Sequence, residues 1–189
     1  MINKTKRAIF ESAIKVFSKS GYDGATVDDI AANAGVAKGT LYYHFKSKEE
    51  IFRFIITEGI EVIKEELQDV LSKDEDALSK MKNLCRVQLN LVYQNKDFFK
   101  VIMSQLWGQE LRQLELRDII EKYVESIEKY VTEAIEAGII KKGEPKFMAY
   151  TFLGVLCSAG IYELLNTQET NVDDVIDNLV MYILKGIQV

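Results

Sequence analysis

The stretch TVDDIAANAGVAKGTLYYHFKSK, from Thr26 to Lys48, decides the fold of this 189-residue chain. Thr26 followed three residues later by Asp29 resembles a capping box, which opens a short helix that ends at Gly35. A second short helix begins two or three residues later and ends at about Phe45. Two short helices joined by such a tight turn predict a helix-turn-helix unit.

The rest of the chain is expected to be helical as well. One proline and eleven glycines leave few interruptions, and apolar residues recur three and four positions apart. We therefore predict an all-α fold of about nine helices, with a three-helix N-terminal domain. Beyond the two helices above, helices are expected at about 4–20, 48–71 and 81–92, at 98–107 with Asp97 as its cap, at 116–135, after Pro145 and after Asn171.

Charge divides the chain into two parts. Residues 1–48 carry eight basic and four acidic side chains, a net charge of +4, whereas the remainder carries 16 basic and 25 acidic ones, a net charge of −9. A basic head on an acidic body favours a polyanion that binds at one end only. We place the domain boundary between residues 47 and 48, and expect the helix that begins there to join head and body without a flexible linker.

The second helix of the unit has two distinct faces. Leu41 and Phe45 lie four residues apart and form its expected buried edge, whereas Gly39 and Tyr43 point outward. A glycine inside a helix costs about 1 kcal/mol relative to alanine, but on an outward face it lets another backbone approach closely. A DNA groove is one such partner. The alternative interpretation is a solvated surface pair of tyrosines beside a lysine.

These residues resemble the DNA-binding segment of the TetR family of bacterial regulators. The similarity continues back through Ala13, Phe17 and Gly21-Tyr22 and covers about the first 50 residues. The resemblance implies that Thr26 and Lys48 contact phosphate and that Leu41 and Phe45 are core. It implies that the following residues approach the major groove, its bases or its backbone: Ala37, Lys38, Gly39, Thr40, Tyr42, Tyr43 and His44. Many relatives have serine at the position of Ala37.

The resemblance also implies a function for the body. Residues 48–189 would form a ligand-binding and dimerisation domain, and a small apolar or aromatic effector would release a repressor from double-stranded operator DNA in the cytoplasm. Pockets for such ligands are lined mostly by apolar and aromatic residues. The expected effector contacts are Phe98, Phe99, Met103, Trp107, Tyr123 and Phe152. Because protein cores have the same composition, these aromatic residues could instead be core.

The helix after Pro145 is apolar nearly all round, which predicts that it is buried on every side. A second subunit could cover one side, and Gly154 and Ser158 would let two helices cross closely. We therefore expect a homodimer through helices near 145–166 and 171–188. The alternative is a central helix of a monomer. Polar residues interrupt its apolar stretch, which favours a buried helix over a membrane span.

The residues that enzymes need are scarce in this sequence. His44 is the only histidine and lies in the DNA-facing segment, so a catalytic triad with histidine in the body is excluded. Cys85 and Cys157 are expected to be reduced core thiols, and neither a metal nor a cofactor is expected. A hydrolase that uses carboxylates alone and an architectural nucleic-acid binder remain as alternatives to the regulator.

Overall fold

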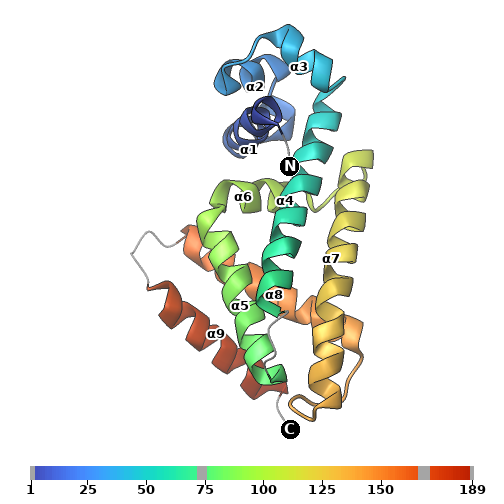
Figure 1. The fold of residues 1–189 in the computed structure, drawn as a ribbon, viewed down its shortest axis with the longest axis vertical. Coiled ribbons are helices and arrows are strands. Elements are labelled where there is room, and N and C mark those ends of the chain that lie inside the picture. The colour runs from blue at the N-terminus through green and yellow to red at the C-terminus, as the bar shows by residue number, and fades with distance from the viewer. Residues whose placement is uncertain (1–2, 72–75, 166–170, 188–189) are drawn as a thin grey trace. The chain divides into compact units, whose positions relative to one another are not determined.

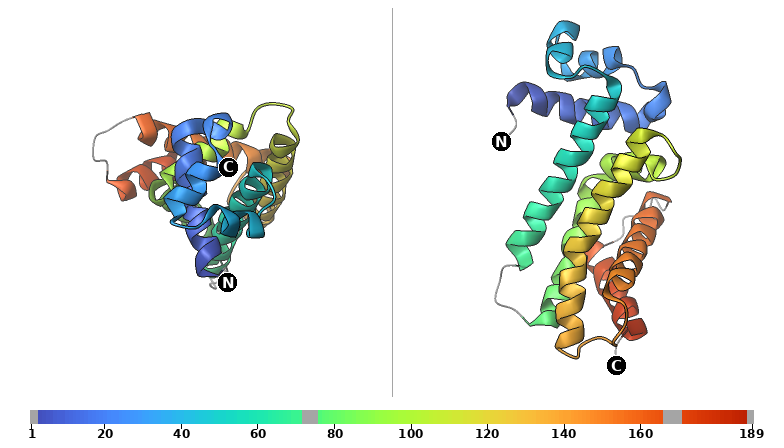
Figure 2. Two further views of the ribbon diagram at one scale, coloured as in Figure 1. Left: turned by 90° about the horizontal axis from the view of Figure 1, so that it is seen from above. Right: turned by 90° about the vertical axis from the view of Figure 1, so that its right-hand side faces the viewer.

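The computed structural model describes residues 3–71, 76–165 and 171–187. These residues form nine α-helices and no strand, as the sequence predicts (Figure 1). Figure 2 shows the same helices in two further views. The helices are α1 (Lys4–Gly24), α2 (Val27–Ala34), α3 (Lys38–His44), α4 (Lys48–Leu71), α5 (Ala77–Gln94), α6 (Lys96–Gln105), α7 (Leu111–Glu136), α8 (Pro145–Leu165) and α9 (Val172–Ile187).

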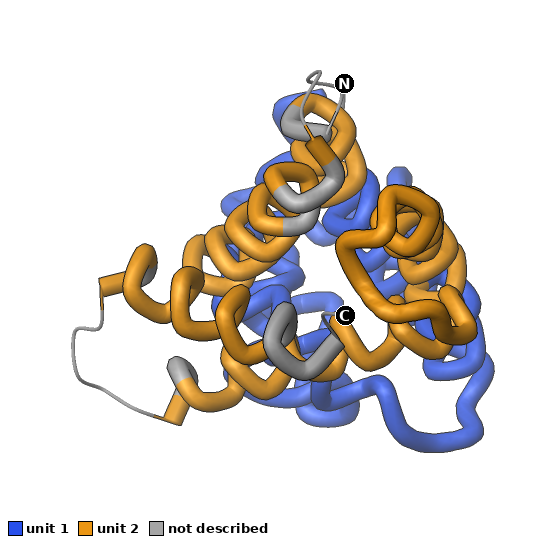
Figure 3. Tube along the Cα trace, turned by 90° about the horizontal axis from the view of Figure 1, so that it is seen from below, with its two compact units in different colours: residues 1–61, 95–119 blue, residues 62–94, 120–189 orange. Residues whose placement is uncertain are grey.

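The helices pack into two compact units, which Figure 3 distinguishes by colour. Unit 1 comprises residues 1–61 and 95–119, and unit 2 comprises residues 62–94 and 120–189. Helix α6 and the first parts of α4 and α7 therefore pack with the three N-terminal helices. The division into domains at residue 47 stays a prediction, because a packing unit and a domain need not share their boundaries.

Local signals place the ends of the first helices. The hydroxyl of Thr26 accepts a hydrogen bond from the backbone N–H of Asp29, and the Asp29 carboxylate accepts one from the N–H of Thr26, at 3.1 and 3.3 Å. Gly35 ends α2 in the left-handed region, with φ of 66°, as the predicted turn requires. Gly21, with φ of 70°, interrupts α1, which continues for one more turn to Gly24.

Aromatic rings form the centre of unit 1. The rings of Phe17 and Tyr22 stack with centroids 5.5 Å apart, and Phe52 of α4 meets both edge-on. Leu41 is completely buried and Phe45 nearly so, which confirms the predicted inner edge of α3. These contacts hold the three N-terminal helices against the start of α4.

Helix α6 begins differently from the prediction. It starts at Lys96, and its N-cap residue Asn95 makes no side-chain capping bond. The carboxylate of Asp97, the predicted cap, instead accepts a hydrogen bond of 2.6 Å from the hydroxyl of Ser18 in α1. The prediction of Asp97 as cap was wrong, because a partner 79 residues away in sequence takes up its carboxylate. The bond ties α6 to α1 within unit 1.

In unit 2, helices α5, α8 and α9 pack against one another in pairs (Figure 1). Helix α8 turns Ala149, Phe152 and Leu156 inward, and α9 turns Ile176, Leu179 and Val180 inward. Of the described helices, none has both the length and the apolar character needed to cross a membrane.

Candidate nucleic-acid interface

The outer face of α3 is open to solvent. Tyr43 is 85% exposed and Tyr42 45% exposed, while Ala37, Lys38, Gly39 and Thr40 are exposed and His44 is half-buried. A Cβ atom built on Gly39 would meet nothing within 4 Å. No contact within this part of the chain therefore requires glycine at position 39. Gly39 therefore leaves open space on the outer face of α3, at a cost in helix propensity of about 1 kcal/mol relative to alanine.

The polar groups beside this face already have partners within the chain. The ammonium of Lys38 lies 2.7 Å from the carboxylate of Asp28, and this hydrogen bond raises the pKa of Lys38. Its nitrogen also lies 5.9 Å from the centre of the Tyr42 ring. Thr26 is exposed, but its hydroxyl serves the cap of α2. A phosphate group would therefore have to displace Asp28 from Lys38, which is a small barrier for an exposed ion pair.

Lys48, for which the family resemblance implies a phosphate contact, has partners within the chain. Its ammonium donates hydrogen bonds to the carbonyls of Tyr22 and Ala25, at 2.7 and 3.0 Å, and reaches that of Asp23 at 3.5 Å. It also lies 4.5 Å from the centre of the Tyr22 ring. This lysine therefore supports the fold by binding the carbonyls at the end of α1. Its contact with phosphate stays a prediction.

A second cation contacts the same tyrosine ring. The guanidinium of Arg112, at the start of α7, lies 3.9 Å from the centre of the Tyr22 ring and 3.7 Å from the carboxylate of Asp23. Burial, and then the nearby Glu49 carboxylate, raise the pKa of Tyr22. Arg112 connects α7 to the end of α1, and the sequence analysis missed it because no local pattern marks a residue 90 positions beyond its partner.

The predicted effector residues divide between the two units, and each unit is described by itself. In unit 1, Phe98 and Phe99 are buried, Met103 is half-buried and Trp107 is 76% exposed. The ring of Phe98 lies directly over Gly59 of α4. In unit 2, Tyr123 and Phe152 are buried. Whether any of the six residues contacts an effector stays a prediction.

One polar residue in the core of unit 2 was not predicted. Gln88 of α5 is 5% exposed, and its amide donates a hydrogen bond of 2.5 Å to the hydroxyl of Tyr123. Its buried Oε1 atom has no hydrogen-bond partner among the described residues. Burial raises the pKa of Tyr123, so its hydroxyl is neutral. The available signal was a glutamine within the apolar stripe of this helix, between Leu84 and Leu91.

The outer face of α8 is apolar. Its exposed large side chains, with those of α9, are Phe147, Tyr150, Ile161, Tyr162, Leu165, Met181 and Tyr182. A Cβ atom on Gly154 would meet nothing within 4 Å, and Ser158 lies one turn further along. Such a face of large apolar side chains is typical of an interface. The predicted dimer segments also include residues 166 and 188, which lie outside the described residues.

Comparison with known proteins agrees with this geometry. Residues 9–55, which contain the helix-turn-helix, match the family described as "Bacterial regulatory proteins, tetR family". The uncharacterized HTH-type transcriptional regulator YhgD of Bacillus subtilis is 31% identical over 152 residues, which cover 78% of each chain. The fatty acid metabolism regulator protein of the same organism is 32% identical over 141 residues, covering 71% of this chain and 70% of that protein.

Solved structures extend the similarity to the body. A Clostridium perfringens protein proposed as a fatty acid metabolism regulator shares 49% identity, with a TM-score of 0.90 over 96% of this chain and 99% of that chain. Bacillus subtilis FadR, solved in complex with stearoyl-CoA, has the same fold, with a TM-score of 0.86 over 96% and 99% of the two chains and 22% identity. The chain belongs to the tetR family of bacterial transcription regulators.

Proposed function

We propose that this protein is a repressor of genes of fatty acid metabolism that binds operator DNA as a homodimer and is released by an acyl-CoA. The 49% identity with the Clostridium perfringens protein along nearly the whole chain carries the proposal. The Bacillus subtilis fatty acid metabolism regulator supports it, and a relative of the same fold holds stearoyl-CoA. An acyl-CoA differs from the small apolar or aromatic effector expected from the sequence, because only its acyl chain is apolar and its coenzyme A part carries phosphates. The cytoplasm is the proposed location, and no catalysis is proposed.

The exposed face of α3 supports the DNA contact. It presents two tyrosines, a threonine and a histidine, with Lys38 at the start of the helix. Tyrosine and threonine hydroxyls bind phosphate or base edges, and a lysine binds phosphate. Lys48 acts on DNA indirectly, because it fixes the end of α1 and with it the packing of the three N-terminal helices.

Replacing Tyr43 and Lys48 separates these two roles. Tyr43→Ala is expected to lower operator affinity about tenfold or more and to change the free energy of unfolding by less than about 0.5 kcal/mol, because the side chain is exposed. Lys48→Ala is expected to lower that free energy by about 1–2 kcal/mol, because buried carbonyls lose a charged donor. Urea unfolding and a DNA-binding titration measure both quantities. Lys122→Ala, which removes an exposed lysine of α7 outside the basic head, is the control.

Two results would contradict this assignment. Unchanged operator affinity in Tyr43→Ala would remove α3 from the proposed interface. Unchanged stability in Lys48→Ala, together with weaker operator binding, would return Lys48 to the direct phosphate contact that the family resemblance implies.

The Gln88–Tyr123 pair supports a polar contact to the effector. An acyl-CoA combines a long apolar chain with a pantetheine arm whose amide N–H groups donate hydrogen bonds. The buried Oε1 atom of Gln88 accepts hydrogen bonds and has no partner among the described residues, so it suits such a donor. A buried polar group without a partner costs free energy until a ligand satisfies it. We therefore add Gln88 to the proposed effector contacts.

Titration of the protein–operator complex with stearoyl-CoA tests the proposed function. The acyl-CoA should release the DNA, and operator DNA should weaken acyl-CoA binding by the same factor, because the two binding equilibria are linked. Gln88→Met should bind acyl-CoA about tenfold more weakly and should change the unfolding temperature little, because the loss of the bond to the buried Tyr123 hydroxyl offsets the removal of the unpaired Oε1 atom. Fluorescence anisotropy of labelled operator gives the release curve.

The alternative functions give different curves. An architectural binder would coat unrelated DNA with equal affinity and would not respond to any acyl-CoA. Acyl-CoA that binds tightly without changing operator affinity would show that it is not the effector.

A further inference from the structure

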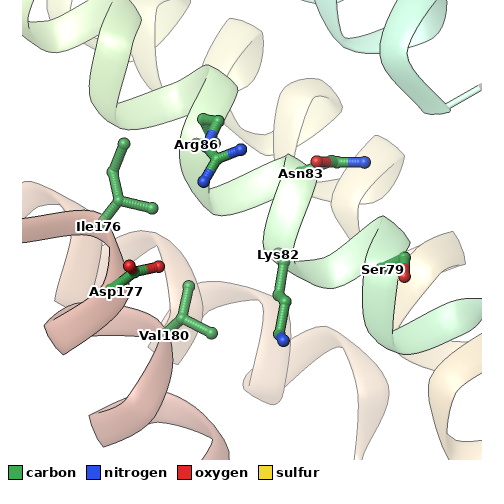
Figure 4. Close-up of a pocket in the computed structure, with 7 residues that line it drawn as sticks. All are labelled: Ser79, Lys82, Asn83, Arg86, Ile176, Asp177 and Val180. Carbon is green, nitrogen blue, oxygen red and sulfur yellow. The ribbon is translucent and has the colours of Figure 1, made fainter. Parts of the chain in front are cut away.

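A pocket of about 360 Å³ lies between α5 and α9 in unit 2 (Figure 4). Helix α5 lines it with Ser79, Lys82, Asn83 and Arg86. These residues share one helix face, because Lys82 and Asn83 lie three and four positions after Ser79, and Arg86 lies four and three positions after them. Helix α9 lines it with Ile176, Asp177 and Val180. One wall of the pocket is thus polar with two cations, and the other is mostly apolar.

No ion pair among the described residues explains why Lys82 and Arg86 lie close together. Lys82 and Arg86 are both exposed and lie one helical turn apart, where like charges repel. Among the described residues neither has a carboxylate within 4.0 Å, although Asp177 lines the same pocket. A doubly charged anion placed between them would turn this repulsion into attraction. Phosphate fits best, because the guanidinium fork binds two of its oxygens and lysine binds it as a point charge.

The wall from α9 suits a flat ring with an amino group. Ile176 is 2% exposed and Val180 7% exposed, so the apolar atoms that line the pocket belong to side chains anchored in the core of unit 2. Asp177 lies between them in sequence, and its carboxylate only accepts hydrogen bonds when ionised. The exocyclic amino group of adenine donates such hydrogen bonds. The pocket therefore matches a phosphate, a flat base and an amino donor together.

We propose that this pocket binds the phosphorylated adenosine end of a coenzyme A thioester. The inference rests on the proposed function, in which the effector is an acyl-CoA. Coenzyme A ends in an adenosine that carries a phosphate monoester, and this group has the three features that the pocket matches. The acyl chain then needs no contact with α9. Free adenine nucleotides share the same chemistry, so the test includes one of them.

The test compares three forms of the full-length chain by isothermal titration calorimetry. They are the unmodified protein, the pocket variant Lys82→Glu/Arg86→Glu, and the control variant Lys122→Glu/Lys129→Glu. The control makes the same change in net charge at two exposed lysines of α7. The pocket variant should bind stearoyl-CoA about tenfold or more weakly, because a charge-assisted hydrogen bond contributes at least this factor. The control should bind it as the unmodified protein does.

Two further ligands show which part of stearoyl-CoA the substitutions in the pocket affect. Stearoyl-pantetheine, which lacks the adenosine and its phosphates, should bind the pocket variant and the unmodified protein equally well. Adenosine 3′,5′-bisphosphate should compete with stearoyl-CoA on the unmodified protein only. Equal affinity of the pocket variant and the control for stearoyl-CoA would overturn the inference while the proposed function stands. So would an equal loss of affinity for stearoyl-pantetheine, because the substitutions would then act on the acyl site or on the fold.

A failure of the proposed function gives a different result. If the unmodified protein binds no acyl-CoA, the proposed effector is wrong. Adenosine 3′,5′-bisphosphate that still binds directly, and is lost in the pocket variant, would then support the pocket as a site for a free nucleotide. If the unmodified protein binds neither stearoyl-CoA nor adenosine 3′,5′-bisphosphate, the inference that the pocket is a nucleotide site is overturned as well.

Discussion

Gly59→Ala is expected to lower the free energy of unfolding by about 1–3 kcal/mol, the usual cost of overpacking a core. A Cβ atom at position 59 would lie 2.2 Å from Cζ of Phe98 and 2.7 Å from its Cε1 and Cε2 atoms. The Phe98 ring is 6% exposed and belongs to α6, so it has little room to withdraw. The loss should exceed the gain in helix propensity of about 1 kcal/mol that alanine brings.

The same substitution in α3 provides the matched control. A Cβ atom at position 39 would have nothing within 4 Å, so Gly39→Ala should raise the free energy of unfolding by about 1 kcal/mol. It should also weaken operator binding if DNA contacts α3 at Gly39.

A second variant tests the contact between Gly59 and Phe98. Phe98→Leu should recover part of the lost stability in the Gly59→Ala background, because it removes the ring that the new methyl group contacts. Guanidinium unfolding of the unmodified protein, Gly59→Ala, Phe98→Leu and the double variant measures the coupling between positions 59 and 98. Additive effects of Gly59→Ala and Phe98→Leu would contradict the contact between α4 and α6.

Glutamates at positions 154 and 158 together are expected to convert the protein to a monomer and to lower operator affinity about a hundredfold or more. Gly154 and Ser158 lie one turn apart on the exposed apolar face of α8, so both charges would be buried without partners between two copies of the chain. A monomer presents one α3, whereas a dimer presents two at successive major grooves, roughly 34–36 Å apart. Binding through one α3 alone loses the gain from linking two sites.

Sedimentation equilibrium at micromolar concentration measures the oligomeric state, and an operator titration measures the affinity. The matched control is Gly154→Ala/Ser158→Ala, which keeps both side chains small and should remain dimeric. Thermal stability of the isolated chain should change little in either variant, since a side chain at position 154 has open space within the chain. If the double-glutamate variant remains dimeric, this face of α8 is not part of the dimer interface.

The sequence by itself determined the all-α fold, the helix-turn-helix and the inner edge of α3. Each of these depends on interactions within about four residues: the capping bonds of Thr26 and Asp29, the left-handed turn at Gly35, and the spacing of Leu41 and Phe45. The family resemblance depends on the same short stretch. Helix caps, turns and helix periodicity depend on residues that are close together in the sequence, so the sequence predicts these features.

Only the tertiary structure decided which polar side chains have partners. The family resemblance gives Lys48 as a phosphate contact, and the sequence shows Asp97 as a cap and Gln88 as one more residue of a helical stripe. Packing brings Lys48 to the carbonyls that end α1, Asp97 to Ser18, and Gln88 to Tyr123. These partners lie between 23 and 79 residues apart along the chain. The residue type determines whether a side chain can donate or accept a hydrogen bond. Its actual partner depends on which helices, distant in sequence, pack beside it.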